Sequence, residues 1–326
     1  MEEEVTRITL VETGRRPHRM RRTRTSGRSA LIGISLLAVS GGVLAMPSAA
    51  IGQSGPGTPR LLVVVAGQSN AIGLGSYAVD PTFGVDFMAP PFANGADVTD
   101  TIVWSESQGA SRLQTQPVPI GTPQLNAAGS QIFGPEVELA RTLQAYTTEP
   151  ITIVKAAYAS TTLQRSWSPT RPNGAFSAMV ALVKGAEAAD SVRGYSDTIG
   201  AFYWYQGETD ALTPGYGALY QANLADLVAA VRSTLPMPSP APFVIAKEDV
   251  SDVCGLACTG NLEVRAADDW AAATLPDVDE VDTAALARNE STPIHLSDQG
   301  EMGLGFLLAA ASGDTLAGEA VKVDNG

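Results

Sequence analysis

Five short apolar runs rich in β-forming residues recur along the chain, and at least one segment of helical period separates each run from the next. The runs cover residues 60–66, 151–155, 199–204, 242–247 and 278–281, and the helical segments cover 135–146, 176–189, 217–234, 262–275 and 301–311. Strands that alternate with helices imply parallel strands joined by right-handed crossovers. The first run lacks polar alternation, which is typical of a sheet covered on both faces. We therefore predict an α/β fold of three layers, α/β/α, with a mainly parallel five-stranded sheet.

The first 50 residues have the layout of an export signal. Eight arginines precede an apolar run over residues 30–46, which ends in the small-residue cluster 47–50. We predict a signal peptide with a basic N-terminal extension over residues 1–50, one folded domain over 58–318 and a C-terminal tail over 319–326. The mature protein is then secreted or held in the cell envelope, through either the general or the twin-arginine route. An uncleaved membrane anchor is the alternative, because the apolar run is near the minimum spanning length.

The exported part is strongly acidic. Removal of residues 1–50 leaves 13 basic and 30 acidic residues, a net charge of −17. Such a field repels polyphosphates and anionic membrane surfaces, so we expect no nucleic-acid partner and no membrane partner after signal removal. The same charge also suits solubility alone. The sequence defines no oligomeric state.

The chain has two cysteines, Cys254 and Cys258. Two thiols without a nearby histidine are too few for a zinc site. In an exported protein, a local disulfide that closes the three-residue loop between them is the simplest interpretation, with two free thiols as the alternative.

Ser69 is a candidate nucleophile because of where the first apolar run ends. Residues 61–66 are followed by Gly67, and the chain then places Ser69 on a tight turn. A serine nucleophile needs a base. The chain has two histidines, and His18 lies in the predicted signal, which leaves His295 as the candidate base.

Other polar residues follow the third and fifth runs. Gln206 and Glu208 come directly after the third, and His295 lies in the loop after the fifth. In an open parallel sheet, ligands bind outside the carboxyl ends of the strands. We therefore expect these residues to meet Ser69 at one rim of the sheet.

Four sequence blocks carry a family resemblance. In chain order they are AGQSN at residues 66–70, FGPE at 133–136, YWYQGETD at 203–210 and IHLSDQGEMGLG at 294–305. Together they resemble the sialate O-acetylesterase-like carbohydrate esterases, which are SGNH-type hydrolases that include acetylxylan esterases. The resemblance covers residues 60–316. It implies a flavodoxin-like SGNH fold and a serine-dependent acetylesterase that removes acetyl groups from acetylated sugars or polysaccharides through an acetyl-enzyme, with no metal or organic cofactor.

The resemblance also assigns roles to residues. It implies that Ser69 is the nucleophile and His295 the general base. The oxyanion hole would then consist of two backbone N–H groups and one side chain, those of Ser69, Gly134 and Gln206 respectively. Three further polar residues of the blocks would support the site: Asn70, Glu136 and Glu208.

One position departs from the family pattern. The family has an aspartate three residues before the histidine, and this chain has Thr292 there. We predict that Glu290, the nearest upstream acid, orients His295, because an acid stabilises an imidazolium better than a neutral carbonyl does. A backbone carbonyl near Thr292 is the alternative and would leave a dyad. Glu208 is interpreted as a brace of its turn.

Two other functions stay open on the same fold. One is a non-catalytic carbohydrate-binding protein, which Thr292 at the acid position favours. The other is an SGNH lipase or thioesterase, which would need an apolar acyl channel. The stretch over residues 73–131 is rich in Pro, Gly, Asn and Ser and predicts an extended polar surface excursion instead.

Overall fold

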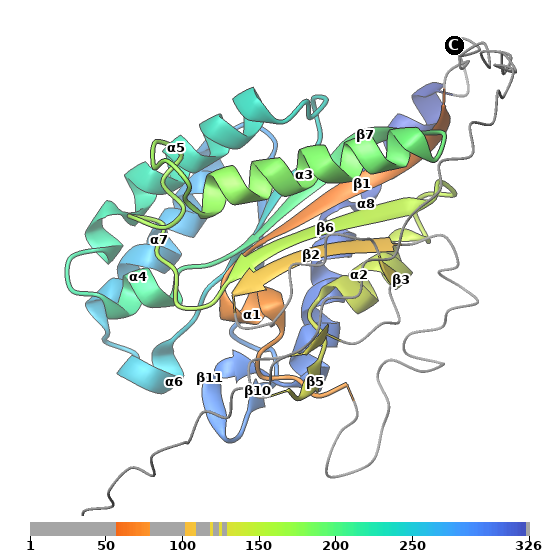
Figure 1. Ribbon diagram of the computed structural model, residues 1–326. Helices are drawn as coiled ribbons and strands as arrows, with labels where there is room; N and C mark the ends of the chain where they lie inside the picture. Colours follow the sequence, from red (N-terminus) through yellow and green to blue (C-terminus); the bar gives the residue numbers. More distant parts are fainter. Residues whose placement is uncertain (1–56, 79–101, 109–117, 120–123, 126–128, 324–326) are drawn as a thin grey trace, which may run out of the picture. The chain divides into compact units, whose positions relative to one another are not determined.

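The computed structural model describes residues 57–78, 102–108, 118–119, 124–125 and 129–323 (Figure 1). The predicted export signal lies outside these residues. None of the helices in the described ranges combines the length and apolarity needed to cross a membrane.

The main sheet of the described residues has seven strands in the order β3-β2-β6-β1-β7-β8-β9. The five predicted runs are all present and mutually parallel: β1 (Thr58–Gly67), β6 (Ile151–Tyr158), β7 (Tyr195–Tyr205), β8 (Phe243–Lys247) and β9 (Val278–Asp282). The predicted three-layer fold with a mainly parallel sheet is confirmed.

Two further strands extend the sheet beyond β6. β2 (Ile102–Gln108) pairs in parallel with β6, and β3 (Val118–Pro119) pairs antiparallel with β2. The prediction of a surface excursion over residues 73–131 is therefore wrong for β2. The hydrogen bonds that hold this strand come from β6, about fifty residues away, so the local pattern did not show them. Two small antiparallel pairs complete the strands: β4 (Gln124–Leu125) with β5 (Gln131–Ile132), and β10 (Arg288–Asn289) with β11 (Thr292–Leu296).

Helices cover both faces of the sheet (Figure 1). One face carries α1 (Ser69–Ile72), α2 (Glu136–Leu143) and α8 (Asp298–Val323). The other carries α3 (Ala175–Val192), α5 (Gly217–Thr234) and α7 (Thr259–Thr274), with the short α4 (Glu208–Leu212) beside α7. The short α6 (Ser251–Cys254) precedes α7. α8 continues past residue 318, so the first residues of the predicted tail belong to this helix.

β1 shows why its sequence lacks polar alternation. Leu62, Val64 and Ala66 pack into the core under α3, α5 and α7. Their neighbours Leu61, Val63 and Val65 pack into the opposite core under α1, α2 and α8. Because both faces are buried, every position must be apolar, and polar residues appear only where the strand ends.

Candidate active site

The turn that presents Ser69 depends on a glycine. β1 ends at Gly67, which has a φ of 150°, and a Cβ there would lie 1.9 Å from the carbonyl oxygen of Tyr205. Any side chain would collide with the backbone of β7, so only glycine allows this close approach. Ser69 then begins α1, and the first N–H groups of a helix have no acceptor within it. The Ser69 N–H is thus open to an external acceptor, as the predicted oxyanion role requires.

Glu208 lies directly beside this turn. Its carboxylate accepts the Ser69 hydroxyl at 2.9 Å and also accepts the side-chain amides of Gln68 and Asn70. Glu208 begins α4 immediately after Gly207, where β7 has ended. The brace interpretation of Glu208 therefore agrees with its contacts, and these contacts also place it on the nucleophile itself. Burial raises the pKa of Glu208 to about 7, although the hydrogen bonds from Ser69 and its neighbours lower it.

Asn70 connects the serine turn to the histidine strand. Its Nδ2 donates to the carbonyl oxygen of Ile294 at 3.1 Å, and its Oδ1 accepts the N–H of Leu296 at 2.9 Å. These two residues flank His295, so one amide side chain holds the backbone on both sides of the histidine. Because Asn70 follows Ser69 directly, these hydrogen bonds bring the candidate nucleophile and the candidate base to one place.

His295 lies half-buried on β11. Burial lowers the pKa of its imidazole, and the nearby positive charge of Arg288 lowers it further. The neutral form, which can accept a proton, is therefore favoured at neutral pH. In the described part of the chain, no hydrogen bond joins the imidazole to Ser69 or to a carboxylate, and the Ser69 hydroxyl donates to Glu208 instead.

The structure does not bring Glu290 to His295. Glu290 is exposed in the turn between β10 and β11, and within the described residues it has no hydrogen bond or ion pair. The register of the hairpin explains this, because Asn289 pairs with Thr292 while Arg288 pairs with Leu296. Residues 293–295 thus lie in a bulge between these two pairs, outside the ladder.

Gln206 is fully buried at the end of β7, and its amide nitrogen is already in use. Nε2 donates to Asp210 at 2.7 Å, to Gln68 at 3.0 Å and to the carbonyl oxygen of Thr161 at 3.0 Å. An oxyanion would have to displace one of these acceptors to receive a hydrogen bond from this amide. The contacts tie the loop after β6 to the serine turn.

Gly134, the second predicted oxyanion donor, is held by a buried ion pair. Its N–H donates to Glu136 at 3.1 Å, and the other oxygen of Glu136 lies 2.8 Å from the ammonium of Lys155. Lys155 also donates to the carbonyl oxygen of Ile72, the last residue of α1. Glu136 therefore supports the position of Gly134 and competes for its N–H.

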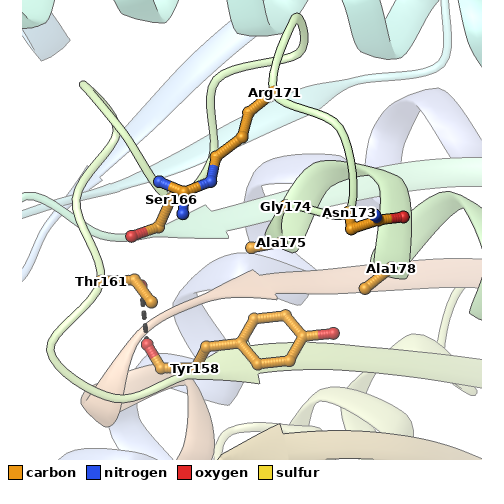
Figure 2. Close-up of a pocket in the computed structure, with 8 residues that line it drawn as sticks. All are labelled: Tyr158, Thr161, Ser166, Arg171, Asn173, Gly174, Ala175 and Ala178. Carbon is orange, nitrogen blue, oxygen red and sulfur yellow. Dashed lines mark hydrogen bonds between the residues drawn. The ribbon is translucent and has the colours of Figure 1, made fainter.

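A polar pocket of about 310 Å³ lies beside the loop after β6 and the start of α3 (Figure 2). Its floor includes Tyr158, which ends β6 one residue beyond the pairing of Ala157 with Gly67. In Figure 2 the guanidinium of Arg171 reaches across the pocket toward Ser166. Its volume is at the lower end of the range for small-molecule sites.

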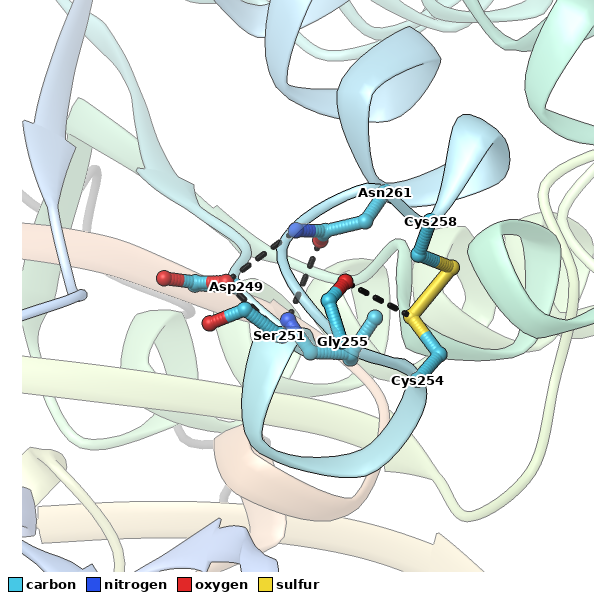
Figure 3. Close-up of a disulfide and its surroundings, with 7 residues drawn as sticks. Asp249, Ser251, Cys254, Gly255, Cys258 and Asn261 are labelled. Carbon is cyan, nitrogen blue, oxygen red and sulfur yellow. Dashed lines mark hydrogen bonds between the residues drawn. A yellow bond between two sulfur atoms is a disulfide. The ribbon is translucent and has the colours of Figure 1, made fainter.

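The two cysteines are joined by a disulfide between α6 and the start of α7 (Figure 3). Beside it, Asn261 accepts the N–H of Val250 at 3.0 Å and donates to Asp249 at 3.1 Å. The carbonyl oxygen of Asp249 in turn accepts Arg288 of β10 at 3.1 Å. The loop after β8 therefore contacts the hairpin that carries the histidine through the carbonyl oxygen of Asp249.

Glu248 is a residue of this site that the sequence reasoning missed. It follows β8 directly, is completely buried and forms a hydrogen bond with Glu208. The rule that identified Gln206 after the third run applies equally to the residue after the fourth, so the signal was present. No cluster of three or more potential metal-ligating side chains occurs among the described residues.

Comparisons with known proteins show the family and the fold. Residues 59–313 match the family described as carbohydrate esterase, sialic acid-specific acetylesterase. A comparison with the sequences of curated proteins gives no match.

Three solved structures are similar in fold. A protein from Arabidopsis thaliana has a TM-score of 0.59 at 21% identity, over 79% of this chain and 98% of its own. A carbohydrate acetylesterase from Xanthomonas citri has a TM-score of 0.53 at 18% identity, over 78% of this chain and 57% of its own. NanS has a TM-score of 0.56 at 13% identity, over 82% of this chain and 99% of its own.

Proposed function

Because the chain belongs to the carbohydrate esterase family of sialic acid-specific acetylesterases and is thus a carboxylic ester hydrolase, we propose that it removes acetyl groups from acetylated sugars with Ser69 as nucleophile. The observation that carries the proposal is the pair of hydrogen bonds made by the Asn70 side-chain amide. This amide holds the backbone on both sides of His295, and Ser69 directly precedes Asn70 in the chain. A nucleophile and a base need this proximity to act together.

The proposed reaction passes through an acetyl-enzyme. The Ser69 oxygen attacks the acetyl carbonyl carbon while its proton passes to His295, and a tetrahedral oxyanion forms. The N–H of Ser69 donates to this oxyanion, and Gly134 and Gln206 donate once it displaces their present acceptors. The C–O bond to the sugar then breaks, and the sugar oxygen takes the proton from His295. Water then gives a proton to the same imidazole and attacks the acetyl carbon. The bond from this carbon to the Ser69 oxygen breaks, acetate leaves, and the Ser69 oxygen takes the proton back from His295.

The pocket beside Tyr158 is the place we assign to the sugar ring. Its residue Tyr158 ends β6, which pairs with the strand that leads into the serine turn, and the pocket is lined by hydroxyl, amide and guanidinium groups that can hydrogen-bond sugar hydroxyls. Arg171 adds a positive charge, which favours a sugar that carries a carboxylate.

Substitution of Ser69 tests the function. Ser69→Ala and His295→Ala should each remove nearly all acetate release from acetylated sialic acid, acetylated xylan and p-nitrophenyl acetate, with the fold intact by circular dichroism. The double variant should be little worse than either single one, because the two residues act as one unit. Equal activity of wild type and Ser69→Ala would favour a carbohydrate-binding protein instead.

Export remains part of the proposal. The basic, apolar and small-residue order of the first 50 residues supports secretion or retention in the cell envelope after cleavage, with residues 58–318 as the SGNH-type esterase domain. The N-terminal sequence of the protein recovered from the culture medium or envelope tests it. A mature chain that starts near residue 50 is expected, whereas an intact N-terminus would favour the membrane anchor.

A further inference from the structure

Two buried carboxyl groups meet beneath the serine turn. Glu208 follows β7 and Glu248 follows β8, and these strands are neighbours in the sheet. Both side chains are buried, and their carboxyl groups are hydrogen-bonded to each other. Two ionised carboxylates have no proton to share, so the pair must hold at least one.

The other partners of the pair indicate where that proton lies. Glu208 accepts three donors, from Gln68, Ser69 and Asn70, and a carboxyl group with three donors is best satisfied as the carboxylate. One oxygen of Glu248 accepts the N–H of Asp249 at 2.9 Å. Its other oxygen, Oε2, is buried and has no donor among the described residues, so this oxygen is free to carry the proton.

The electrostatics agree with this assignment. Burial raises the pKa of Glu208 to about 7. Burial also raises the pKa of Glu248 well above its usual range, and the adjacent negative charge of Glu208 raises it further. Glu248 therefore keeps its proton to a higher pH than Glu208, as one member of a coupled pair of carboxyl groups does. Since Glu208 has more donors, the first proton leaves Glu208.

We propose that Glu248 is a positioning residue of the esterase, a protonated carboxyl group whose O–H donates to Glu208 and fixes the carboxylate that holds the Ser69 hydroxyl and the Asn70 amide. The proposal rests on the proposed serine mechanism. Through Asn70 the same chain of hydrogen bonds reaches the backbone at Ile294 and Leu296, on either side of His295. Glu248 thus aligns both halves of the site without contact with the substrate.

Several charged or titratable groups surround the pair, and they come from four elements and one adjoining residue. They are Tyr205 on β7, Tyr220 on α5, Arg265 and Asp268 on α7, Arg288 on β10 and the adjacent Asp249. Arg288 favours one negative charge on the pair, and burial opposes a second. When Glu248 ionises at alkaline pH, the hydrogen bond to Glu208 becomes a repulsion between like charges, and the serine turn loses its support.

Two substitutions of Glu248 separate a donor from an acceptor role. Gln has the shape of a protonated Glu and keeps an N–H donor toward Glu208, but it does not ionise. Glu248→Gln should keep kcat/KM within about threefold of wild type at pH 7, and it should lose the alkaline fall in activity. Glu248→Leu should lose about 10² in kcat with little change in KM, because the catalytic groups are misplaced and substrate binding is not.

The matched control is Asp268→Asn. Asp268 is another completely buried acid whose pKa burial raises well above its usual range, and no hydrogen bond joins its carboxyl group to Glu208 among the described residues. This variant should keep both the activity and the alkaline limb of the wild type. Thermal unfolding of each variant reports whether the fold is intact.

The outcomes are distinct. An equal loss of kcat in Glu248→Gln and Glu248→Leu would overturn the proposal, and so would full activity of both. If Glu248→Leu does not fold, the pH profile of Glu248→Gln decides alone, since an unchanged alkaline limb contradicts the donor role. Failure of the serine mechanism is recognised separately, because Ser69→Ala would then remain active.

Discussion

Replacement of Asn70 by Ala tests whether this residue joins the two halves of the site. The substitution removes hydrogen bonds to Ile294 and Leu296 and a third one to the buried carboxylate of Glu208. A neutral hydrogen bond contributes about 1 kcal/mol and one to a charged group about 2 kcal/mol, so the free energy of unfolding should fall by about 4 kcal/mol. The backbone at His295 also loses its support, and a displacement of about 1 Å can cost about 10² in kcat.

Urea denaturation and the hydrolysis of p-nitrophenyl acetate measure the two effects. Asn261→Ala is the matched control, because Asn261 is also buried and bridges a loop with two hydrogen bonds, yet no hydrogen bond joins it to the serine turn among the described residues. It should be destabilised while its kcat stays near that of wild type. A loss of less than about 1 kcal/mol in Asn70→Ala, with kcat retained, would refute the bridging role.

Asn70→Asp makes the outcome of the same test depend on pH. The aspartate keeps an acceptor for the Leu296 N–H but places a second carboxylate against Glu208. The pKa of Glu208 is raised to about 7, so Glu208 is charged above this pH and neutral below it. The repulsion should therefore be largest above pH 7 and fall as the pH drops through 7, in contrast to Asn70→Ala.

Two more predictions concern the acid and the sugar. Glu290→Gln should stay near wild type because Glu290 is exposed in the hairpin turn, whereas Glu208→Gln should lose about 10² in kcat. Wild-type activity should also fall as the pH drops through about 7, where Glu208 becomes protonated. A large loss of kcat in Glu290→Gln alone, measured over pH 5 to 9, would restore Glu290 as the triad acid. Arg171→Gln should raise KM about tenfold for acetylated sialic acid and leave KM for acetylated xylan unchanged, because only the former carries a carboxylate; equal changes for both would remove the pocket as a carboxylate site.

The strands, the helices and the serine turn were predictable because each leaves a local trace. A buried strand needs a continuous apolar run, and the approach of β1 to β7 needs a glycine at position 67. The hairpin was not predictable in the same way. Its register is set by a bulge over residues 293–295 and by Arg288, which bonds the backbone of a loop about 40 residues earlier. Proximity in sequence therefore favoured Glu290, although the ladder keeps it from His295.

Glu248 shows a different limit of sequence reasoning. A lone Glu after a strand has the same local pattern whether it is solvated, paired with a cation or protonated, and only its neighbours decide. Here the neighbour is another carboxyl group. Two buried carboxylates side by side would be unfavourable, because burial penalises charge. The pair becomes favourable because one member is neutral and donates, while the other has three donors that stabilise its charge. A single proton thus converts a repulsive pair into the support of the serine turn.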